Sequence, residues 1–487
     1  MSVSLKHKSL AGFSWNFLDK LLNQIVQFLL SIVLARLLIP ENYGVVGLAY
    51  VVISLVNCLL NTGMNASLIR AKEAKDKDFY TYFWVEFGLR TFCFILIFIA
   101  APFVANYYQT PILCSIIRWL ALATPLMSFT CVQNIILARS LNFRTTCGIG
   151  IFSSLISGLI AVVAAWKGVG VWALVIQNLV GNLLYIVLIN IKVPWFPRFI
   201  FSGAAFVTMF HFGYKLFLSG ILNTVYNNIY SLIIGKWFSV KQLGFYTKGH
   251  QIPAMAVESV NGPIGSVIYP ALSKLQDDPE RFRQAFQKGL LTTMFIIIPM
   301  LWGMAACAHS LLFVLFGEKW LPATFFLQVV AISYAFFPMH TFNLQAIMAL
   351  GRSDTFLYLE FIKKIYSIII IICVIPYGIY PLVMSVLICT VISIFVNSYP
   401  LRKLIDWGPL KQLGALFPTI ISAGLMGICV WGLGHVPLNK FLLLPIQILS
   451  GILLYLLFSF CFNRRILIDS IKLCWNFISP YLARKNA

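Results

Sequence analysis

Long apolar runs alternate with short polar connections along almost the whole chain. Because a helix needs about 20 apolar residues to cross the hydrocarbon of a bilayer, each run of that length predicts one transmembrane helix. Fourteen such runs occur, near residues 13–38, 45–69, 80–105, 112–138, 147–166, 170–191, 207–234, 245–270, 289–316, 323–349, 355–376, 380–400, 413–433 and 441–462. The connections leave no room for a globular domain, so the pattern predicts an all-α integral membrane protein.

Composition and charge support a membrane protein and orient it. The chain is 60% hydrophobic and only 10% charged, against about 25% charged in soluble domains. A net charge of +21 would suggest nucleic acid in a polar protein, but here the basic residues are scattered between apolar runs. We therefore expect the lipid bilayer as a partner and no nucleic acid. Lys and Arg are roughly three times as frequent in one set of alternate connections, which places both termini in the cytoplasm.

The cysteines and histidines give no sign of a metal or cofactor site. Most of the 11 cysteines lie inside apolar runs, no CxxC pair occurs, and the six histidines show no ligand spacing. We therefore expect no metal, no cofactor and no disulfide framework. The first apolar run is too long for a signal-peptide core and lacks a cleavage site, so we expect it to remain as the first transmembrane helix.

An offset of 200 residues relates two halves of the chain. ARLLIPENYG (35–44) ends one apolar run, and GKWFSVKQLG (235–244) ends another. Polar residues spaced four apart precede each motif, namely Asp19, Asn23, Gln27 and Ser31, and then Ser219, Asn223, Asn227 and Ser231. Residues at this spacing share a helical face, and amides facing lipid would lose their hydrogen bonds. We expect both stripes to face a shared central cavity, with polar contacts between helices as the alternative.

The repeat predicts two pseudo-symmetric six-helix lobes, 1–200 and 201–402, related by an axis along the membrane normal. Two extra helices would occupy 403–463, followed by a cytoplasmic tail, 464–487, that is either an interfacial helix or a frayed end. Residues 276–290, QDDPERFRQAFQKGL, have a similar pair of interpretations. They form an interfacial helix with Phe282 and Phe286 on one face, or a solvated linker.

Charged residues inside the predicted helices are candidates for function, because each costs roughly 3 kcal/mol on insertion scales. Four basic residues lie at a similar depth near the cytoplasmic side, namely Lys20, Arg90, Lys215 and Lys363. We expect them to form a cationic ring that binds a multiply charged anion from the cytoplasm. Alternatively, Arg90 neutralises Glu86 four residues earlier, Lys363 pairs with Glu360, and Lys20 and Lys215 snorkel to the interface.

Three further charged residues have open roles. Arg118 lies near the outer end of the fourth helix, where it serves at an exit site or only snorkels. Asp19 and Glu258 are candidate proton or cation sites for ion coupling, or balance a nearby lysine.

Seven segments resemble, in order, the motifs of one family. They are LARLLIPENYGVVGLA (34–49), SLNFR (140–144), GVGVWALVIQ (168–177), IIGKWFSVKQLGFYTKG (233–249), YPALSKLQDDPERFR (269–283), FGEKW (316–320) and ALGRSD (349–354). Together they resemble the Wzx-type polysaccharide flippases, in the colanic-acid and teichuronic-acid exporter group of the polysaccharide transporter family. That family belongs to the multidrug/oligosaccharidyl-lipid/polysaccharide exporter superfamily. The resemblance spans about residues 10–400.

The resemblance implies a V-shaped, two-lobed helical bundle in the bacterial inner membrane, and a transporter rather than an enzyme. Its substrate would be a polyprenyl-pyrophosphate-linked oligosaccharide, moved to the outer leaflet by alternating access for surface polysaccharide such as capsule or lipopolysaccharide. A polysaccharide polymerase and assembly proteins are candidate partners. The family often has an acidic residue where this chain has Tyr230, which leaves ion coupling at that position open.

Three other functions remain as alternatives. A peptidoglycan lipid-precursor flippase would use cationic side chains for its substrate in a similar way. A cation-coupled drug exporter of the same superfamily would favour acidic cavity walls, whereas the predicted helices hold six basic and four acidic residues. A membrane polymerase or ligase is disfavoured, because it would need a large outer loop. The glycan, the coupling ion and the oligomeric state stay open.

Overall fold

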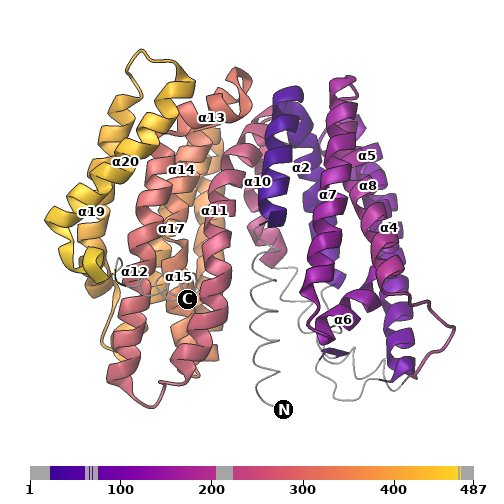
Figure 1. Ribbon diagram of the computed structural model, residues 1–487, viewed down its shortest axis with the longest axis horizontal. Coiled ribbons are helices and arrows are strands. Elements are labelled where there is room, and N and C mark those ends of the chain that lie inside the picture. The colour runs from indigo at the N-terminus through magenta and orange to yellow at the C-terminus, as the bar shows by residue number, and fades with distance from the viewer. Residues whose placement is uncertain are drawn as a thin grey trace, which may run out of the picture. The chain divides into compact units, whose positions relative to one another are not determined.

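The computed structural model describes residues 22–60, 65, 68–69, 75–203, 223–469 and 472, with the backbone alone for 58–60 and 263–267. Within these residues all regular secondary structure is helical, which confirms the all-α prediction. The chain divides into two compact units, Met1–Thr247 (unit 1) and Lys248–Ala487 (unit 2). Figure 1 shows the helices of both units. The lobe boundary near residue 200 stays a prediction.

Unit 1 begins, in its described part, with the helix Leu22–Leu37. It continues through α2 (Pro40–Leu60), α4 (Asp76–Tyr107), α5 (Pro111–Leu126), η1 (Met127–Thr130), α6 (Cys131–Arg139), α7 (Phe143–Trp166), α8 (Trp172–Lys192), α10 (Ile229–Trp237) and the first turns of α11 (Val240–Ser273). The helices α4 and α5 pack together, as do α7 and α8. Asn142 caps α7 by accepting a hydrogen bond from the Thr145 N–H group. Pro125 precedes the 3₁₀ segment η1, which interrupts the predicted span 112–138.

Unit 2 contains the rest of α11 and the helices that follow. These are α12 (Pro279–Ala306), α13 (Ala308–Phe316), η2 (Glu318–Ala323), α14 (Thr324–Tyr334), α15 (Phe337–Ala349), α16 (Ser353–Val374), η3 (Ile375–Tyr377), α17 (Ile379–Ser398), α18 (Leu401–Leu404), α19 (Pro409–Leu433) and α20 (Lys440–Phe462). The helix α12 packs against α14 and α19, and α19 packs against α20. One hydrophobic cluster runs through α12, α15 and α19 and forms the core of this unit.

Nine helical segments of the described residues are long and apolar enough to cross a membrane. They overlap predicted apolar runs, and α2, α11 and α16 occupy three other predicted runs. The largest difference is at the predicted run 289–316, since α12 begins and ends ten residues earlier and α13 follows it. The protein is therefore a multi-pass membrane protein.

The start of α12 corrects one interpretation of the sequence. Asp278 caps this helix by accepting a hydrogen bond from the Arg281 N–H group, and the helix then runs without a break through Ala306. Phe282 and Phe286 are fully buried, and the Phe286 ring packs edge-on against the ring of Trp407. The predicted helix and the shared face of Phe282 and Phe286 are confirmed, and the solvated linker is wrong. The face packs into the core of unit 2 instead of facing the membrane interface. The similar question for the tail lies largely outside the described residues.

The two segments related by the 200-residue offset pack against each other through their glycines. A Cβ atom at Gly44 would lie 1.8 Å from the backbone oxygen of Val240, and one at Gly244 would lie 1.9 Å from the backbone oxygen of Pro40. The 200-residue offset relates Gly44 to Gly244 and Pro40 to Val240, so it turns each contact into the other. A local two-fold relation between the repeats requires this. Only glycine, which has no Cβ atom, lets two helix starts approach this closely.

Two further pairs at this contact are related by the same offset. The Lys241 ammonium group lies 3.5 Å from a carboxylate oxygen of Glu41. A Cβ atom at Gly47 would lie 3.3 Å from the Thr247 hydroxyl oxygen. Each pair joins a residue to its own counterpart, so both lie near the local two-fold axis.

The double variant Glu41→Lys/Lys241→Glu is expected to be more stable than either single charge reversal. Both side chains are partly exposed, so the ion pair should contribute about 0.2–1 kcal/mol, and each single reversal places like charges together. Thermal unfolding of the wild type, the two single variants and the double variant measures the coupling. Strictly additive losses in the double variant would show that the pair contributes nothing.

Candidate functional site

A polar cavity of about 390 Å³ lies within unit 1 between the helix Leu22–Leu37, α2, α6, α7 and α8. Amide and hydroxyl side chains dominate its lining, namely Gln27, Tyr50, Asn134, Ser153, Ser154, Ser157, Gln177, Asn178, Asn182 and Tyr185. No charged residue of the described chain belongs to this lining. Its volume falls in the range of small-molecule sites, and polar groups gathered inside a membrane bundle indicate a substrate pathway.

A second cavity, of about 570 Å³, adjoins the first. The two share the lining residues Tyr50, Met127, Asn178 and Asn182. The second cavity adds polar side chains from α2, α4 and α5, namely Ser54, Asn57, Arg90 and Thr124. Together the two cavities form one polar region, which we call the unit-1 cavity.

Hydrogen bonds from α8 orient the amides of this cavity. The Asn182 amide nitrogen donates to the Asn178 amide oxygen at 3.0 Å, and the Asn178 nitrogen donates to the Tyr50 hydroxyl at 3.3 Å. The Tyr185 hydroxyl donates to the Asn134 amide oxygen at 2.8 Å. Because an amide has two N–H donors and one acceptor oxygen, these bonds leave further donors and acceptors for a ligand.

Serines of α7 form another part of the wall. The Gln27 amide nitrogen donates to the Ser154 hydroxyl at 3.0 Å, and the Ser157 hydroxyl donates to the Ser154 carbonyl at 3.2 Å. A Cβ atom at Gly181 of α8 would lie 3.1 Å from the Ser157 hydroxyl oxygen, so α7 and α8 approach closely here. The Ser153 side chain is 3% exposed and its hydroxyl has no hydrogen-bond partner among the described residues. A buried hydroxyl without a hydrogen-bond partner costs roughly 1–3 kcal/mol of free energy. A polar ligand that bonds to Ser153 would recover this cost.

Arg90 is the one cation among the described lining residues, and a carboxylate of its own helix binds it. The Arg90 Nε atom donates to Glu86 Oε2 at 2.8 Å. Glu86 is 2% exposed and also accepts a hydrogen bond from the Tyr82 hydroxyl at 3.3 Å. The unit-1 cavity therefore meets a paired and formally neutral guanidinium–carboxylate group.

Three residues of the first predicted stripe, Asn23, Gln27 and Ser31, belong to the described part of the chain. Gln27 lines the unit-1 cavity, and the Asn23 amide lies about 3.4 Å from where a Cβ atom of Gly150 would stand on α7. Ser31 is half-buried on the same helix.

Of the second predicted stripe, Ser219 lies outside the described residues, and the other three members do not line the unit-1 cavity. Asn223 and Asn227 are exposed and Ser231 is half-buried. Their neighbour Asn228 instead donates to the Ser54 hydroxyl at 3.5 Å, next to the second cavity.

Only part of the predicted cationic ring is visible. Lys20, Lys215 and the neighbouring Asp19 lie outside the described residues. Lys363 donates a short hydrogen bond to the Glu360 carboxylate one turn earlier on α16. Both described members of the ring, Arg90 and Lys363, are therefore paired with a carboxylate, and the ring stays a prediction.

The two remaining candidate charges lie apart from the cavity lining. The Arg118 Nε atom donates to the Phe98 carbonyl of α4 at 3.3 Å, and its guanidinium stands 4.2 Å from the centre of the Phe98 ring. Glu258 is exposed on α11. Their roles at an exit site and in ion coupling stay predictions.

The sequence reasoning missed most of the cavity lining. Gln177, Asn178, Gly181, Asn182 and Tyr185 recur along one face of α8 at helical spacing, and Ser153, Ser154 and Ser157 do so on α7. These uncharged stripes are present in the sequence, but they lie on helices other than the two that carry the predicted stripes.

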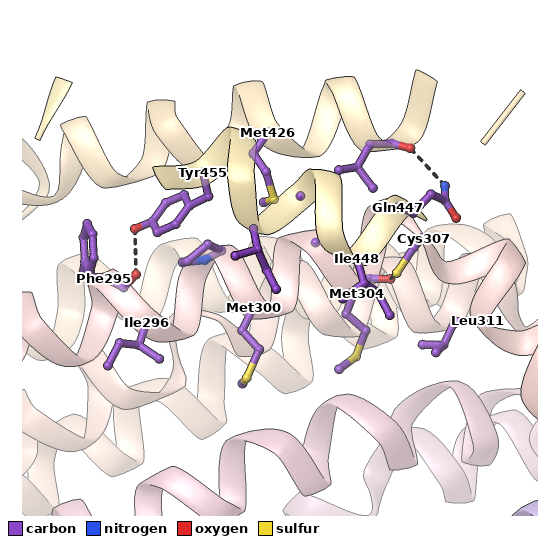
Figure 2. Close-up of a pocket in the computed structure, with 15 residues that line it drawn as sticks. Phe295, Ile296, Met300, Met304, Cys307, Leu311, Met426, Gln447, Ile448 and Tyr455 are labelled. Atoms are coloured by element: carbon purple, nitrogen blue, oxygen red, sulfur yellow. Dashed lines mark hydrogen bonds between the residues drawn. The ribbon is translucent and has the colours of Figure 1, made fainter. Parts of the chain in front are cut away.

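An apolar groove of about 490 Å³ lies in unit 2, between α12, α19 and α20 (Figure 2). Its polar side chains point to backbone partners. The Tyr455 hydroxyl donates to the Phe295 carbonyl at 2.7 Å, and the Gln447 amide nitrogen donates to the Val430 carbonyl at 3.0 Å. Methionines and aliphatic side chains form the remaining surface, which suits hydrocarbon rather than sugar.

Three relatives with similar sequences are named for polysaccharide biosynthesis or transport. The teichuronic acid biosynthesis protein TuaB of Bacillus subtilis is 23% identical over 462 residues, which cover 93% of this chain and 95% of TuaB. The succinoglycan biosynthesis transport protein ExoT of Rhizobium meliloti is 25% identical over 319 residues, 66% of this chain and 65% of ExoT. The lipopolysaccharide biosynthesis protein WzxC of Escherichia coli is 24% identical over 324 residues, 65% of each chain.

Two solved structures share the fold. The lipid II flippase MurJ in an inward closed conformation superimposes with a TM-score of 0.70 at 16% identity, over 93% of this chain and 99% of MurJ. An inward-facing multidrug resistance transporter of the MATE family gives 0.58 at 13% identity, over 82% and 98%. These similarities show that the chain has the fold of these two transporters. A family model described as polysaccharide biosynthesis protein matches residues 33–325, and the chain belongs to that family.

Proposed function

We propose that the protein moves a polyprenyl-pyrophosphate-linked oligosaccharide from the inner to the outer leaflet of the bacterial inner membrane, with both termini in the cytoplasm. The observation that carries this proposal is the unit-1 cavity, which places uncharged hydrogen-bonding side chains inside a bundle of membrane-spanning helices. Relatives named for teichuronic acid, succinoglycan and lipopolysaccharide biosynthesis support a glycan as the cargo. The product would enter surface polysaccharide through a polymerase and assembly proteins.

Each part of the substrate would meet a different surface. The glycan enters the unit-1 cavity, and Lys20 and Lys215 bind the pyrophosphate near the cytoplasmic side. The polyprenyl chain stays in lipid or against apolar surface. An inside-negative membrane potential favours outward movement of an anion by about 2.3 kcal/mol per charge per 100 mV, to which ion coupling at Asp19 or Glu258 would add.

Alternating access requires a contact that closes the path on one side. We assign this role to the reciprocal contact of Gly44 with Val240 and of Gly244 with Pro40. In the predicted topology these segments lie at the outer face, so their packing would hold the transporter closed to the outside. The contact would separate as lobes 1–200 and 201–402 move relative to each other.

Lys20→Ala and Lys215→Ala are each expected to lower glycan export at least tenfold, because each removes a charge from the proposed pyrophosphate site. The measurement is surface glycan in a bacterial strain that lacks its own flippase, at matched expression. Lys167→Ala is the control, since Lys167 is exposed where α7 ends, and this variant should export like the wild type.

The outcomes of this experiment separate the two parts of the proposal. If both lysine variants export normally, the pyrophosphate site is wrong and the flippase assignment stands. If the wild type restores no surface glycan but rescues growth of a strain lacking its lipid II flippase, the cargo is the peptidoglycan precursor instead.

A further inference from the structure

The chemistry of the unit-1 cavity indicates which part of the substrate it binds. Resting on the proposed function, we propose that this cavity is a binding site for an uncharged pyranose ring of the glycan, separate from the pyrophosphate site. We also propose that the Glu86–Arg90 pair makes the site prefer neutral over acidic sugars.

The mixture of donors and acceptors favours a sugar over a phosphate. A phosphate group mainly accepts hydrogen bonds, so phosphate sites gather N–H donors and unpaired cations. Each sugar hydroxyl both donates and accepts, as do the amides and hydroxyls that line this cavity. Adjacent amides, such as Asn178 and Asn182 one turn apart on α8, present donor and acceptor together to neighbouring hydroxyls.

A tyrosine ring stands where the two parts of the cavity meet. Tyr50 lines both parts, and its hydroxyl is fixed by the Asn178 amide nitrogen at 3.3 Å. A ring held in this way offers an apolar face to the C–H face of a pyranose and a polar edge to its hydroxyls. Tyr185, held by Asn134, offers a second ring in the first part of the cavity.

The paired arginine works against an acidic ligand. Glu86 is almost fully buried, so its carboxylate depends on Arg90 and the Tyr82 hydroxyl for compensation. A uronic acid or a phosphate near Arg90 would compete with Glu86 for the guanidinium and add a second negative charge in a region of low dielectric. The repulsion between this second negative charge and the Glu86 carboxylate would make the site select neutral ligands.

The alternative is that these polar side chains serve only to hold the helices together, and two features of the unit-1 cavity argue against it. Contacts of that kind pack helices without space between them, whereas the two parts of this cavity hold about 390 and 570 Å³. They would also pair their buried hydroxyls, whereas the buried Ser153 hydroxyl in the cavity wall has no partner among the described residues.

The test is binding of defined lipids to the purified full-length protein in lipid nanodiscs. The probes are undecaprenyl pyrophosphate alone, the same lipid bearing glucose, galactose or N-acetylglucosamine, and the same lipid bearing glucuronic acid. The wild type is expected to bind at least one of the neutral glycolipids about tenfold more tightly than the bare lipid or the glucuronyl lipid.

Two variants and a control make this test specific. Asn178→Leu is expected to remove the neutral-sugar preference and leave the affinity for the bare lipid within about twofold. Glu86→Gln, which releases the Arg90 charge into the cavity, is expected to raise the affinity for the glucuronyl lipid about tenfold, a gain that misfolding would not produce. The control is Asn190→Leu, on the same helix, whose amide donates to the Phe129 and Ile186 carbonyls and does not line the cavity.

The outcomes distinguish this inference from the function on which it rests. Equal affinity of the wild type for all the lipids overturns the sugar site and leaves the flippase proposal standing. So does a loss of bare-lipid affinity in Asn178→Leu as large as its loss of glycolipid affinity. If the wild type binds none of the lipids, the proposed function fails, and the inference fails with it.

Discussion

Replacing Gly44 with alanine is expected to lower glycan export at least tenfold, because the added Cβ atom would lie 1.8 Å from the backbone oxygen of Val240. Cβ atoms do not approach other heavy atoms more closely than 3.0 Å, and a backbone carbonyl in a helix cannot rotate away as a flexible side chain can. The starts of α2 and α11 would therefore have to separate. If their contact closes the transport path, this variant should populate the outward-open state and lose the cycle.

A change of state and a loss of folding can be measured separately. A cysteine at Thr247, beside Gly47 in this contact, should react faster with a membrane-impermeant thiol reagent in Gly44→Ala than in the wild-type background. Thermal unfolding of the same samples reports the folded fraction. Gly244→Ala should behave alike, because its Cβ atom would lie 1.9 Å from the Pro40 oxygen.

Gly148→Ala is the matched control for these variants. Gly148 lies within α7, where nothing stands within 4 Å of an added Cβ atom, so its replacement should be neutral or slightly stabilising. Normal export by a folded Gly44→Ala protein would show that the glycine contact is not required to close the path.

The sequence predicted the helices and the repeat better than the contacts between them. The apolar runs indicated where helices form, because hydrophobic length alone determines whether a segment can span the bilayer. The 200-residue offset showed that Gly44 and Gly244 are equivalent positions, but equivalence does not say that each packs against the other copy. That contact depends on tertiary packing. The burial of Phe282 and Phe286 was missed for the same reason, since their spacing suits a lipid-facing surface as well as a protein core.

The site was predicted only in part, because a similar depth of two cations in the membrane does not determine which groups they pair with. Arg90 and Lys363 lie at similar depths in their predicted helices, which suggested a shared ring. Each is bound instead by a carboxylate one turn away, Glu86 or Glu360, and a partner within the same helix needs no tertiary arrangement. Gln27 lines the unit-1 cavity and donates to the Ser154 hydroxyl, and a central cavity shared by both stripes stays a prediction.

Replacing Arg90 with alanine is expected to cost about 3–5 kcal/mol of folding free energy, because Glu86 would keep a buried and unpaired charge. That is a large part of the roughly 5–15 kcal/mol that stabilises a typical domain, so little folded protein should accumulate. The double variant Glu86→Gln/Arg90→Gln removes both charges and keeps side chains that form hydrogen bonds. It should recover folded protein, as measured by thermal unfolding and by the monodisperse fraction after detergent extraction.

Arg118→Ala is the matched control for this loss, because the Arg118 guanidinium binds the Phe98 carbonyl and ring rather than a carboxylate. Its removal leaves no carboxylate unpaired and should cost about 1 kcal/mol of folding free energy or less. If Arg90→Ala folds like the wild type but loses export, Arg90 acts on the anionic substrate, as the cationic ring requires. If Arg90→Ala instead loses folded protein and the double variant regains it, Arg90 serves to neutralise Glu86. The pyrophosphate must then be bound by cations other than Arg90, which is the condition that a neutral sugar site in unit 1 requires.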